Sequence, residues 1–458
     1  MPGTHLQRSE TAAAGDAARP RLGYAWYVVL ALTAIYMLSF VDRQVLSLLV
    51  GPIKRELGVS DTRIGLLQGL AFALFYTLMG LPLGRMVDTR NRRNLIALGL
   101  VVCSVFTSVC SLARSYWTLF LGRMGVGIGE ATLSPAAYSL IADYFPNERL
   151  GVAISVFYMG VFLGASLSFL VVGLTVDALA RTPVLSLPLL GAIASWRVTF
   201  LIVGVPGLLF ALLVYTIREP GRRDLLRARD GRPTQLSFGE ALAQMRQRWQ
   251  SVAGLSLGAI FQSACAYALL AWAPAFLQRT QGWSAGQAGR GLAVILVTFG
   301  CAGMYAGGLV ADRWSRRGDC AGPLKVAVVS GLGTFILLPL ATLVPRVEWT
   351  FVLMAPGVFF LALPMGTSVA ALQRIFPNQV RGQVSALFLF FLNLGGQTLG
   401  PLGPGFLNDH LFHSERALGP SMALTIGFAA ILMQVVFLAT YGPYQRHYQA
   451  MHGAPNRT

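Results

Sequence analysis

Residues 84–93 read GRMVDTRNRR, and residues 308–317 read GLVADRWSRR. Each stretch follows a long apolar run and carries a glycine, an aspartate and a closing pair of arginines at matching positions. A second pair of segments, FPNERLG at 145–151 and FPNQVRG at 376–382, recurs in the same order. Two ordered matches indicate an internal duplication, in which each half of the chain forms one bundle and a pseudo-two-fold axis relates the bundles.

The composition indicates that much of the surface faces lipid. Hydrophobic residues make up 55% of the 458 residues and charged residues only 12%, whereas a soluble domain carries about 25% charged residues. Roughly 20 apolar residues in a helix cross a bilayer core, and twelve segments reach that length. We therefore predict an all-α integral membrane protein with twelve transmembrane helices in two pseudo-symmetric six-helix bundles. The predicted spans are 24–50, 63–84, 93–113, 116–142, 150–176, 193–217, 251–277, 286–311, 323–345, 349–374, 381–407 and 419–441.

The positions of the basic residues predict the orientation of these spans. The formal net charge is +17, and most arginines and lysines lie in the tails and in the connections that follow even-numbered spans. Basic loops stay in the cytoplasm, so both termini are expected there. Because topology explains the charge, we expect no nucleic-acid partner. The predicted parts are an N-terminal tail (1–23), a first bundle (24–217), a basic linker (218–250), a second bundle (251–441) and a C-terminal tail (442–458).

The basic linker includes one segment with a separate structural prediction. Residues Phe238–Trp249 are a candidate for a helix that lies at the membrane surface. A solvated linker that only fixes topology is the alternative.

The duplicated loop resembles the signature of the major facilitator superfamily of secondary transporters. Its pattern, G-x-x-x-D-R-x-G-R-R between the second and third spans, is matched at Gly84, Asp88, Arg92 and Arg93. Thr89 and Asn91 depart from the pattern. The resemblance covers nearly the whole chain and implies that the two bundles rock about a central site to expose it to either side of the membrane.

The loop motif has the chemistry of a latch between the bundles. Asp88 and Asp312 lie at expected helix ends, where a carboxylate accepts charge-assisted hydrogen bonds from arginine or from a helix N-terminus. Arg149 and Arg381, in the two FPN segments, are the expected partners, and Arg92 belongs to the same motif. We expect these residues to gate the cytoplasmic side. The alternative, that the arginines only set topology, suits the other arginines of these loops best.

Four charged residues fall inside predicted spans, where charges are costly and usually functional. Asp42 and Arg43 lie in the first span, and Arg123 and Glu130 lie on one face of the fourth. A rise of about 1.5 Å per residue puts the first three at one level and Glu130 deeper. We expect Asp42 and Glu130 to exchange protons as their surroundings change during transport. A structural ion-pair cluster, or a hydrated Asp42 near the outer face, are the alternatives.

The segments around these charges, LSFVDRQVLSLL (38–49) and GRMGVGIGEATLSPAAY (122–138), resemble the spinster branch of the superfamily. In that branch the acids bind protons, and the basic residues, here Arg43 and Arg123, organise the acids or meet an anionic headgroup. The resemblance implies a bacterial homologue in the inner membrane that moves a lysophospholipid or sphingolipid-like substrate with proton coupling. A carrier of small organic anions or hydrophobic drugs is the alternative.

Polar and aromatic residues on central spans are candidates for the cavity wall. An enzyme acting on lipids is not favoured, because none of the five histidines lies at membrane depth, and a sensor or scaffold is a third possibility. We expect a monomer with no metal and no cofactor besides coupling protons; the five cysteines resemble small buried hydrophobes. The candidates for the cavity wall are Tyr36, Gln68, Tyr138, Tyr158, Gln262, Tyr267, Gln373, Asn393 and Gln397.

Overall fold

The structure is a computed structural model that describes residues 22–182, 184–187, 191–220, 238–317 and 319–452. Its first half comprises α1 (Leu22–Leu57), α2 (Asp61–Gln68), α3 (Leu70–Thr89), α4 (Arg92–Cys110), α5 (Tyr116–Glu130), α6 (Leu133–Tyr144), α7 (Asn147–Leu179), β1 (Val184–Leu187), β2 (Gly191–Ala194) and α8 (Ser195–Val214). Its second half comprises α9 (Phe238–Gln247), α10 (Trp249–Thr280), α11 (Ala285–Ile295), the π-helix η1 (Leu296–Gly300), α12 (Cys301–Arg316), α13 (Gly322–Leu343), α14 (Val347–Ala362), α15 (Thr367–Arg374), α16 (Asn378–Leu407), the π-helix η2 (Asn408–Phe412), the 3₁₀ helix η3 (Glu415–Ala417) and α17 (Leu418–His452).

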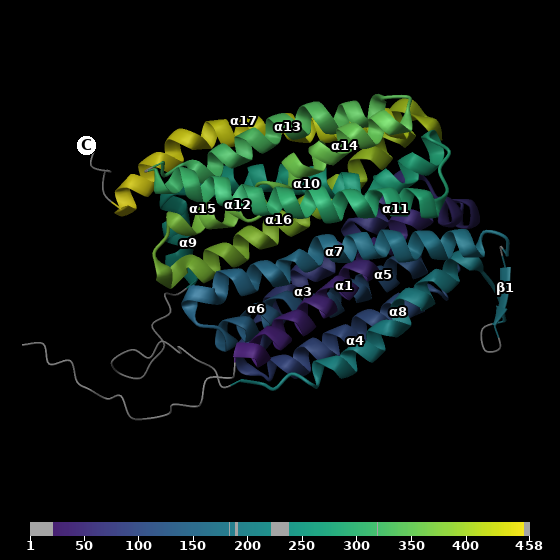
Figure 1. Ribbon diagram of the computed structural model, residues 1–458, viewed down its shortest axis with the longest axis horizontal. Coiled ribbons are helices and arrows are strands. Elements are labelled where there is room, and N and C mark those ends of the chain that lie inside the picture. The colour runs from purple at the N-terminus through teal and green to yellow at the C-terminus, as the bar shows by residue number, and fades with distance from the viewer. Residues whose placement is uncertain (1–21, 183, 188–190, 221–237, 318, 453–458) are drawn as a thin grey trace, which may run out of the picture.

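The two halves lie side by side as separate helical bundles (Figure 1). Within the described residues, eleven helical segments are long and apolar enough to cross a membrane, which confirms the predicted all-α membrane fold. The predicted fourth span is interrupted between Glu130 and Leu133, so α5 and α6 are each shorter than a full span. The predicted C-terminal tail from residue 442 is helical as far as His452, as the end of α17.

The repeated sequence segments adopt the same local structure in both halves. Pro146 precedes α7 with φ −70° and ψ 155°, and Pro377 precedes α16 with φ −68° and ψ 154°. Proline fixes φ near this value and donates no backbone hydrogen bond. The FPN segments therefore turn the chain from one span into the next at equivalent places of the two bundles.

Two elements of the structure lie outside the predicted spans. The antiparallel strands β1 and β2 form a hairpin that projects from one end of the molecule (Figure 1). We call this end the hairpin end, and the opposite end, where α1 begins and α17 stops, the terminal end. In α9, Ala241 and Met245 pack against the other helices of the second half, and Leu242 is 51% exposed. Residues 221–237 of the linker lie outside the described residues.

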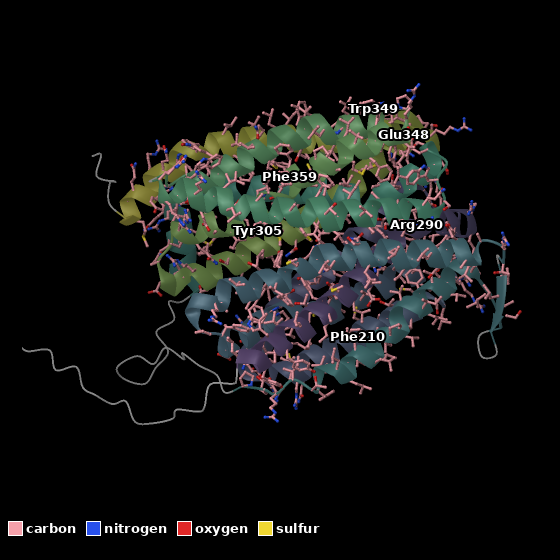
Figure 2. All side chains as sticks on the ribbon, viewed as in Figure 1. Phe210, Arg290, Tyr305, Glu348, Trp349 and Phe359 are labelled. Atoms are coloured by element: carbon pink, nitrogen blue, oxygen red, sulfur yellow. The ribbon has the colours of Figure 1, made fainter. Side chains whose placement is uncertain are left out.

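Apolar side chains cover the flanks of both bundles. Leu209 and Phe428 are 66% and 65% exposed, as expected for side chains that face lipid. Figure 2 shows the labelled Phe210 and Tyr305 on these flanks, and Trp349 and Arg290 toward the hairpin end. The polar surface is therefore concentrated toward the two ends of the molecule.

Glycines bring backbones of the two halves into close contact at several places of their interface. A Cβ added at Gly69, between α2 and α3, would lie 2.4 Å from the carbonyl oxygen of Gln397 on α16. A Cβ at Gly289 on α11 would lie 2.1 Å from the carbonyl oxygen of Phe169 on α7. Only glycine permits such contact between backbones, so these positions hold the halves together in the conformation seen here.

Candidate functional site

Arg43 of α1 and Glu130 at the end of α5 form a buried ion pair. Their side chains are only 7% and 2% exposed. Arg43 Nη1 also donates to the hydroxyl of Tyr267 on α10, at 3.1 Å. The Arg43 guanidinium therefore links a buried carboxylate of the first half to a side chain of the second half.

Aromatic rings surround the same guanidinium. Its central carbon lies 4.5 Å from the ring centre of Phe40, 4.4 Å from that of Phe72 and 5.4 Å from that of Tyr76. A cation over an aromatic face gains electrostatic attraction, and more so where water is excluded. These rings partly offset the cost of holding Arg43 away from solvent.

The Arg123 guanidinium and the Asp42 carboxyl each bond other groups rather than each other. Arg123 donates to the main-chain carbonyls of Asp42, at 2.9 Å, and Arg43, at 3.1 Å. The fully buried Asp42 carboxyl accepts instead from the thiol of Cys103 on α4, at 3.3 Å. Arg123 thus fixes the backbone of α1 at the two residues whose side chains carry charge.

A polar pocket opens beside Arg43 at the interface of the halves. Its walls come from α1 and α2 in the first half, and from α10 and α16 in the second. The polar candidates Gln68, Tyr267 and Gln397 all line this pocket, and no sequence pattern predicted that they meet Arg43 there. The lining residues are Arg43, Gln44, Gln68, Tyr267, Ala271, Gln397 and Pro401.

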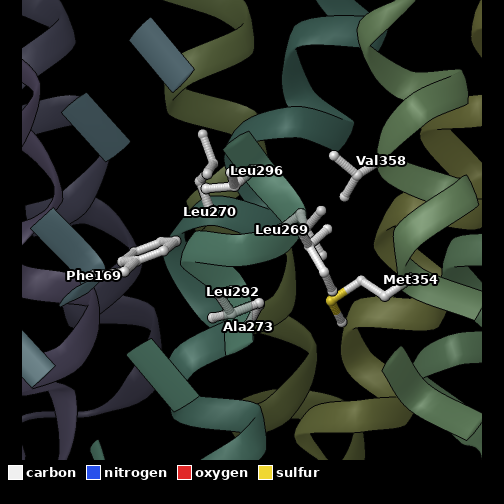
Figure 3. A pocket seen from close by; sticks show the side chains of 9 residues that line it. Phe169, Leu269, Leu270, Ala273, Leu292, Leu296, Met354 and Val358 are labelled. Atoms are coloured by element: carbon white, nitrogen blue, oxygen red, sulfur yellow. The ribbon is translucent and has the colours of Figure 1, made fainter. Parts of the chain in front are cut away.

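A second pocket is lined by apolar side chains, including several from α10 (Figure 3). Leu269 and Ala273 face this pocket, while Tyr267 and Ala271 face the polar one. Residues four apart share a helix face, so α10 separates two pockets of opposite character. The apolar pocket is lined by Phe169, Leu269, Leu270, Ala273, Leu292, Ile295, Leu296, Met354 and Val358.

At the hairpin end, a buried network of charges joins the halves. Asp61 at the start of α2 is fully buried and accepts from Arg279 of α10 at 2.8 and 3.0 Å. It also accepts from Lys54 of α1, at 3.0 Å, and from Asn408, at 2.6 Å. Lys54 in turn contacts Glu415 of the second half, at 2.7 Å. These bonds close the hairpin end, and we call them the hairpin-end gate.

The same gate uses the N-terminus of α2. Asp409 of the second half accepts from the backbone amides of Asp61, at 3.2 Å, and Thr62, at 2.6 Å. The first amides of a helix lack partners within the helix and attract negative charge. A carboxylate from one half therefore caps α2 of the other half.

At the terminal end, the predicted latch residues do not all engage the opposite half. Arg92 is buried and forms ion pairs with Asp143 and Glu219 of its own half. Arg149 and Asp312 are exposed. Arg381 donates to the carbonyl of Phe376, in its own half, at 2.8 Å. The side chain of Asp88 lies outside the described residues.

The other predicted cavity residues do not line the polar pocket, and Gln373 is exposed. Tyr36 stacks on Phe157 with ring centres 4.6 Å apart, and Tyr138 packs edge-on against the same ring. Tyr158 packs against that cluster. The remaining candidates make hydrogen bonds within the second half: Gln262 to the Leu361 carbonyl, Gln373 to Ser385, and Asn393 to both Leu389 and Gln397.

This arrangement of two bundles around a buried charged centre agrees with comparison to known proteins. Residues 32–401 match the Major Facilitator Superfamily. The chain belongs to this superfamily. It is a multi-pass membrane transporter and not an enzyme.

Among its relatives, an MFS-type efflux pump of Mycolicibacterium smegmatis is 30% identical over 92% of this chain and 94% of its own length. The hexuronate transporter of Bacillus subtilis is 25% identical over 88% of this chain and 93% of its own. The crystal structure of a bacterial homolog to the human lysosomal transporter Spinster, in an inward-facing and unoccupied conformation, matches with a TM-score of 0.75. It is 26% identical and covers 94% of this chain and 98% of its own. These similarities support a spinster-like transporter.

Proposed function

We propose that this chain is a proton-coupled secondary transporter of an amphipathic anion, such as a lysophospholipid or a sphingolipid-like molecule. The observation that carries the proposal is the buried Arg43–Glu130 ion pair with its hydrogen bond to Tyr267 of the other half. A change in the protonation of Glu130 changes how firmly it holds Arg43. Because Arg43 also contacts the second half, that change alters the interface on which alternating access depends.

We propose that both termini lie in the cytoplasm, so that the hairpin end faces outward. In that orientation the hairpin-end gate would close this conformation to the outside. We propose that the bundles rock to break this gate, while Asp88, Arg92, Arg149, Asp312 and Arg381 regroup at the terminal end. We further propose that the chain works as a monomer, with protons as the coupling ion, no other cofactor and no nucleic-acid partner.

The polar pocket that carries Arg43 supports a negatively charged headgroup. The apolar pocket, lined by Phe169, Met354 and aliphatic side chains, is a separate site, because α10 lies between the two pockets.

A carrier of small organic anions is the second candidate. The polar pocket suits a carboxylate without any tail, and the similar Bacillus subtilis protein is a hexuronate transporter. The two candidate substrates differ in whether they carry an apolar tail beside the anionic group.

The test uses purified protein in sealed proteoliposomes with an imposed pH gradient. We expect uptake of a labelled lysophospholipid that depends on the gradient and is inhibited by other lysophospholipids. Gradient-dependent uptake of labelled glucuronate, with no lysophospholipid flux, would favour the small-anion carrier.

A further inference from the structure

A third pair of matching segments lies at the hairpin end. Residues 58–60 read GVS and precede α2, and residues 282–284 read GWS and precede α11, 224 positions later. The glycine has a positive φ in both segments, 60° in the first and 68° in the second. Ser60 and Ser284 each cap the following helix by accepting from the backbone amide three residues on. The two halves therefore begin α2 and α11 in the same way.

These two helices also make equivalent contacts with the opposite half. An added Cβ at Gly65 of α2 would lie 2.5 Å from the carbonyl oxygen of Pro401 on α16. An added Cβ at Gly289 of α11, 224 positions after Gly65, would lie 2.1 Å from the carbonyl oxygen of Phe169 on α7. Figure 1 shows α7 and α11 next to each other across the interface. The halves therefore meet at two related places, α2 with α16 and α11 with α7.

At each of these places, a carboxylate of one half lies at the first turn of a helix of the other half. Asp409, which follows α16, accepts from backbone amides of α2. Asp177, near the end of α7, accepts from the hydroxyl of Ser284, the N-cap residue of α11, at 2.7 Å. Asp177 Oδ2 also lies only 2.3 Å from the position of a Cβ added at Gly286, in the first turn of α11. Helix N-termini attract negative charge, so both carboxylates join the halves by the same chemistry.

We propose that Asp177 is a second gating residue of the hairpin end, the pseudo-symmetric counterpart of Asp409, and that its bond to Ser284 holds α7 of one half against α11 of the other. The inference rests on the proposed rocking of the bundles and is independent of the substrate and of the coupling ion. Rocking of two rigid bundles separates both places together. Loss of either carboxylate therefore favours opening at both.

The two places differ in the charge that their helices carry. The first residue of α2 is Asp61, which is buried and accepts from Lys54 and Arg279. The equivalent first residue of α11 is Ala285, which carries no charge, so α11 brings no counterpart of this ion-pair network. The contact of α7 with α11 thus depends on Asp177 for the charged interaction that two carboxylates supply at the other place.

The test measures distances between spin labels across both places in the purified full chain, without substrate. One pair of labels, at Arg181→Cys and Arg290→Cys, spans the contact of α7 with α11. The other pair, at Arg63→Cys and His413→Cys, spans the contact of α2 with α16. All four positions are exposed, and the two partly exposed cysteines are replaced by serine.

We expect Asp177→Ala to raise the ratio of open to closed molecules about tenfold to a hundredfold, because it removes a hydrogen bond to a charged group. Both pairs of labels should then move apart, since the bundles move as whole bodies. The comparison is repeated in Asp61→Asn, in which the hairpin-end gate is already weakened, so that a strongly closed protein still reports the change. Asp177→Asn keeps an acceptor for Ser284 but no charge, and it should give a smaller increase.

A second variant tests the partner of Asp177. Ser284→Ala should lengthen the same distances, and adding it to Asp177→Ala should change them little further, because both variants remove the same bond. The matched control is Glu56→Ala, which removes a carboxylate that bonds Trp196 and Arg197 within the first half. Its label distances should equal those of the unmodified protein. Equal elution volumes in size-exclusion chromatography show that the variants fold.

Two results would overturn the proposal. One is a set of distances that Asp177→Ala leaves unchanged in both backgrounds. The other is a longer distance between the labels at 181 and 290 alone, which would show that Asp177 only orders its own helix end. Proton-driven flux with unchanged distances would contradict the gating role and leave the transport function intact. Longer distances in a chain without proton-driven flux would contradict the proposed function and leave the gating role intact.

Discussion

At the residue scale, Arg123 holds the charged centre through the backbone of α1. Its guanidinium bonds the carbonyls of Asp42 and Arg43, which neighbour each other in the helix. Inside a helix these carbonyls already accept from the residues four positions on, so Arg123 supplies an additional, charged donor to each. The side chain is 1% exposed, so its two hydrogen bonds to α1 depend on the planar, forked arrangement of the guanidinium donors.

We predict that Arg123→Lys lowers both stability and transport. A lysine carries the charge but not the fork of donors that reaches two carbonyls, and a hydrogen bond to a charged group contributes about 1.5–3 kcal/mol. The loss should appear as a lower melting temperature of the purified protein. Arg149→Lys, at an exposed arginine, is the control; equal melting temperatures of the two variants would contradict this role.

Replacing both members of the Arg43–Glu130 pair separates stability from function. Glu130→Gln alone leaves a buried guanidinium without its counter-charge, and breaking a buried pair costs about 3–5 kcal/mol. The double variant Arg43→Gln, Glu130→Gln removes both charges and should recover much of the melting temperature but no proton-driven transport. Recovery of transport in the double variant would show that the pair is only structural.

Residue types and helical spacing predicted that the four membrane charges share one region, but not how they pair. Counting the rise per residue put Glu130 deeper than Arg43, whereas the structure pairs these two. A long arginine side chain spans more than a helical turn, so differences in backbone depth do not decide the partner. The hydrogen bond from Arg43 to Tyr267 depends on how the two halves pack together, and no local sequence pattern predicts that packing.

At the element scale, the hairpin-end gate connects α1 and α2 to α10, η2 and η3. We predict that Asp61→Asn favours opening of this end, because Lys54 and Arg279 lose their shared carboxylate. Spin labels at Arg63→Cys and His413→Cys, with Cys301 and Cys320 replaced by serine, should then move apart. Both labelled positions are exposed and lie in opposite halves.

Glu56→Gln is the control for this experiment. Glu56 bonds Trp196 and Arg197 within the first half, so its loss should leave the distance between the labels unchanged. A distance that stays the same in Asp61→Asn as well would show that the glycine contacts alone keep this end closed.

Elements were predictable where the apolar pattern was continuous. The spans and the matching FPN turns follow from length and from proline. The break between α5 and α6 was not predicted, because Ala131 and Thr132 are compatible with a helix; in the structure Thr132 packs where Gly99 leaves room. The π-helix η1 and the β1–β2 hairpin are likewise set by packing and by backbone pairing, and no strong residue signal marks them.

At the scale of the whole molecule, the closed hairpin end depends on contact between backbones of the two halves. We predict that Gly289→Val opens this end, because its Cβ would come within 2.1 Å of the Phe169 carbonyl oxygen. The same pair of spin labels should report a longer distance. Gly51→Val, where an added Cβ meets nothing within 4 Å, should leave the distance unchanged; similar behaviour of both variants would contradict the account.

The central claim is that Glu130 couples proton movement to transport. The most direct test compares the unmodified protein with Glu130→Gln in sealed proteoliposomes, with a labelled lysophospholipid and an imposed pH gradient. We predict gradient-dependent flux in the unmodified protein, and only the rate seen without a gradient in the variant. Equal gradient-dependent flux in both proteins would contradict the claim and remove Glu130 from the mechanism.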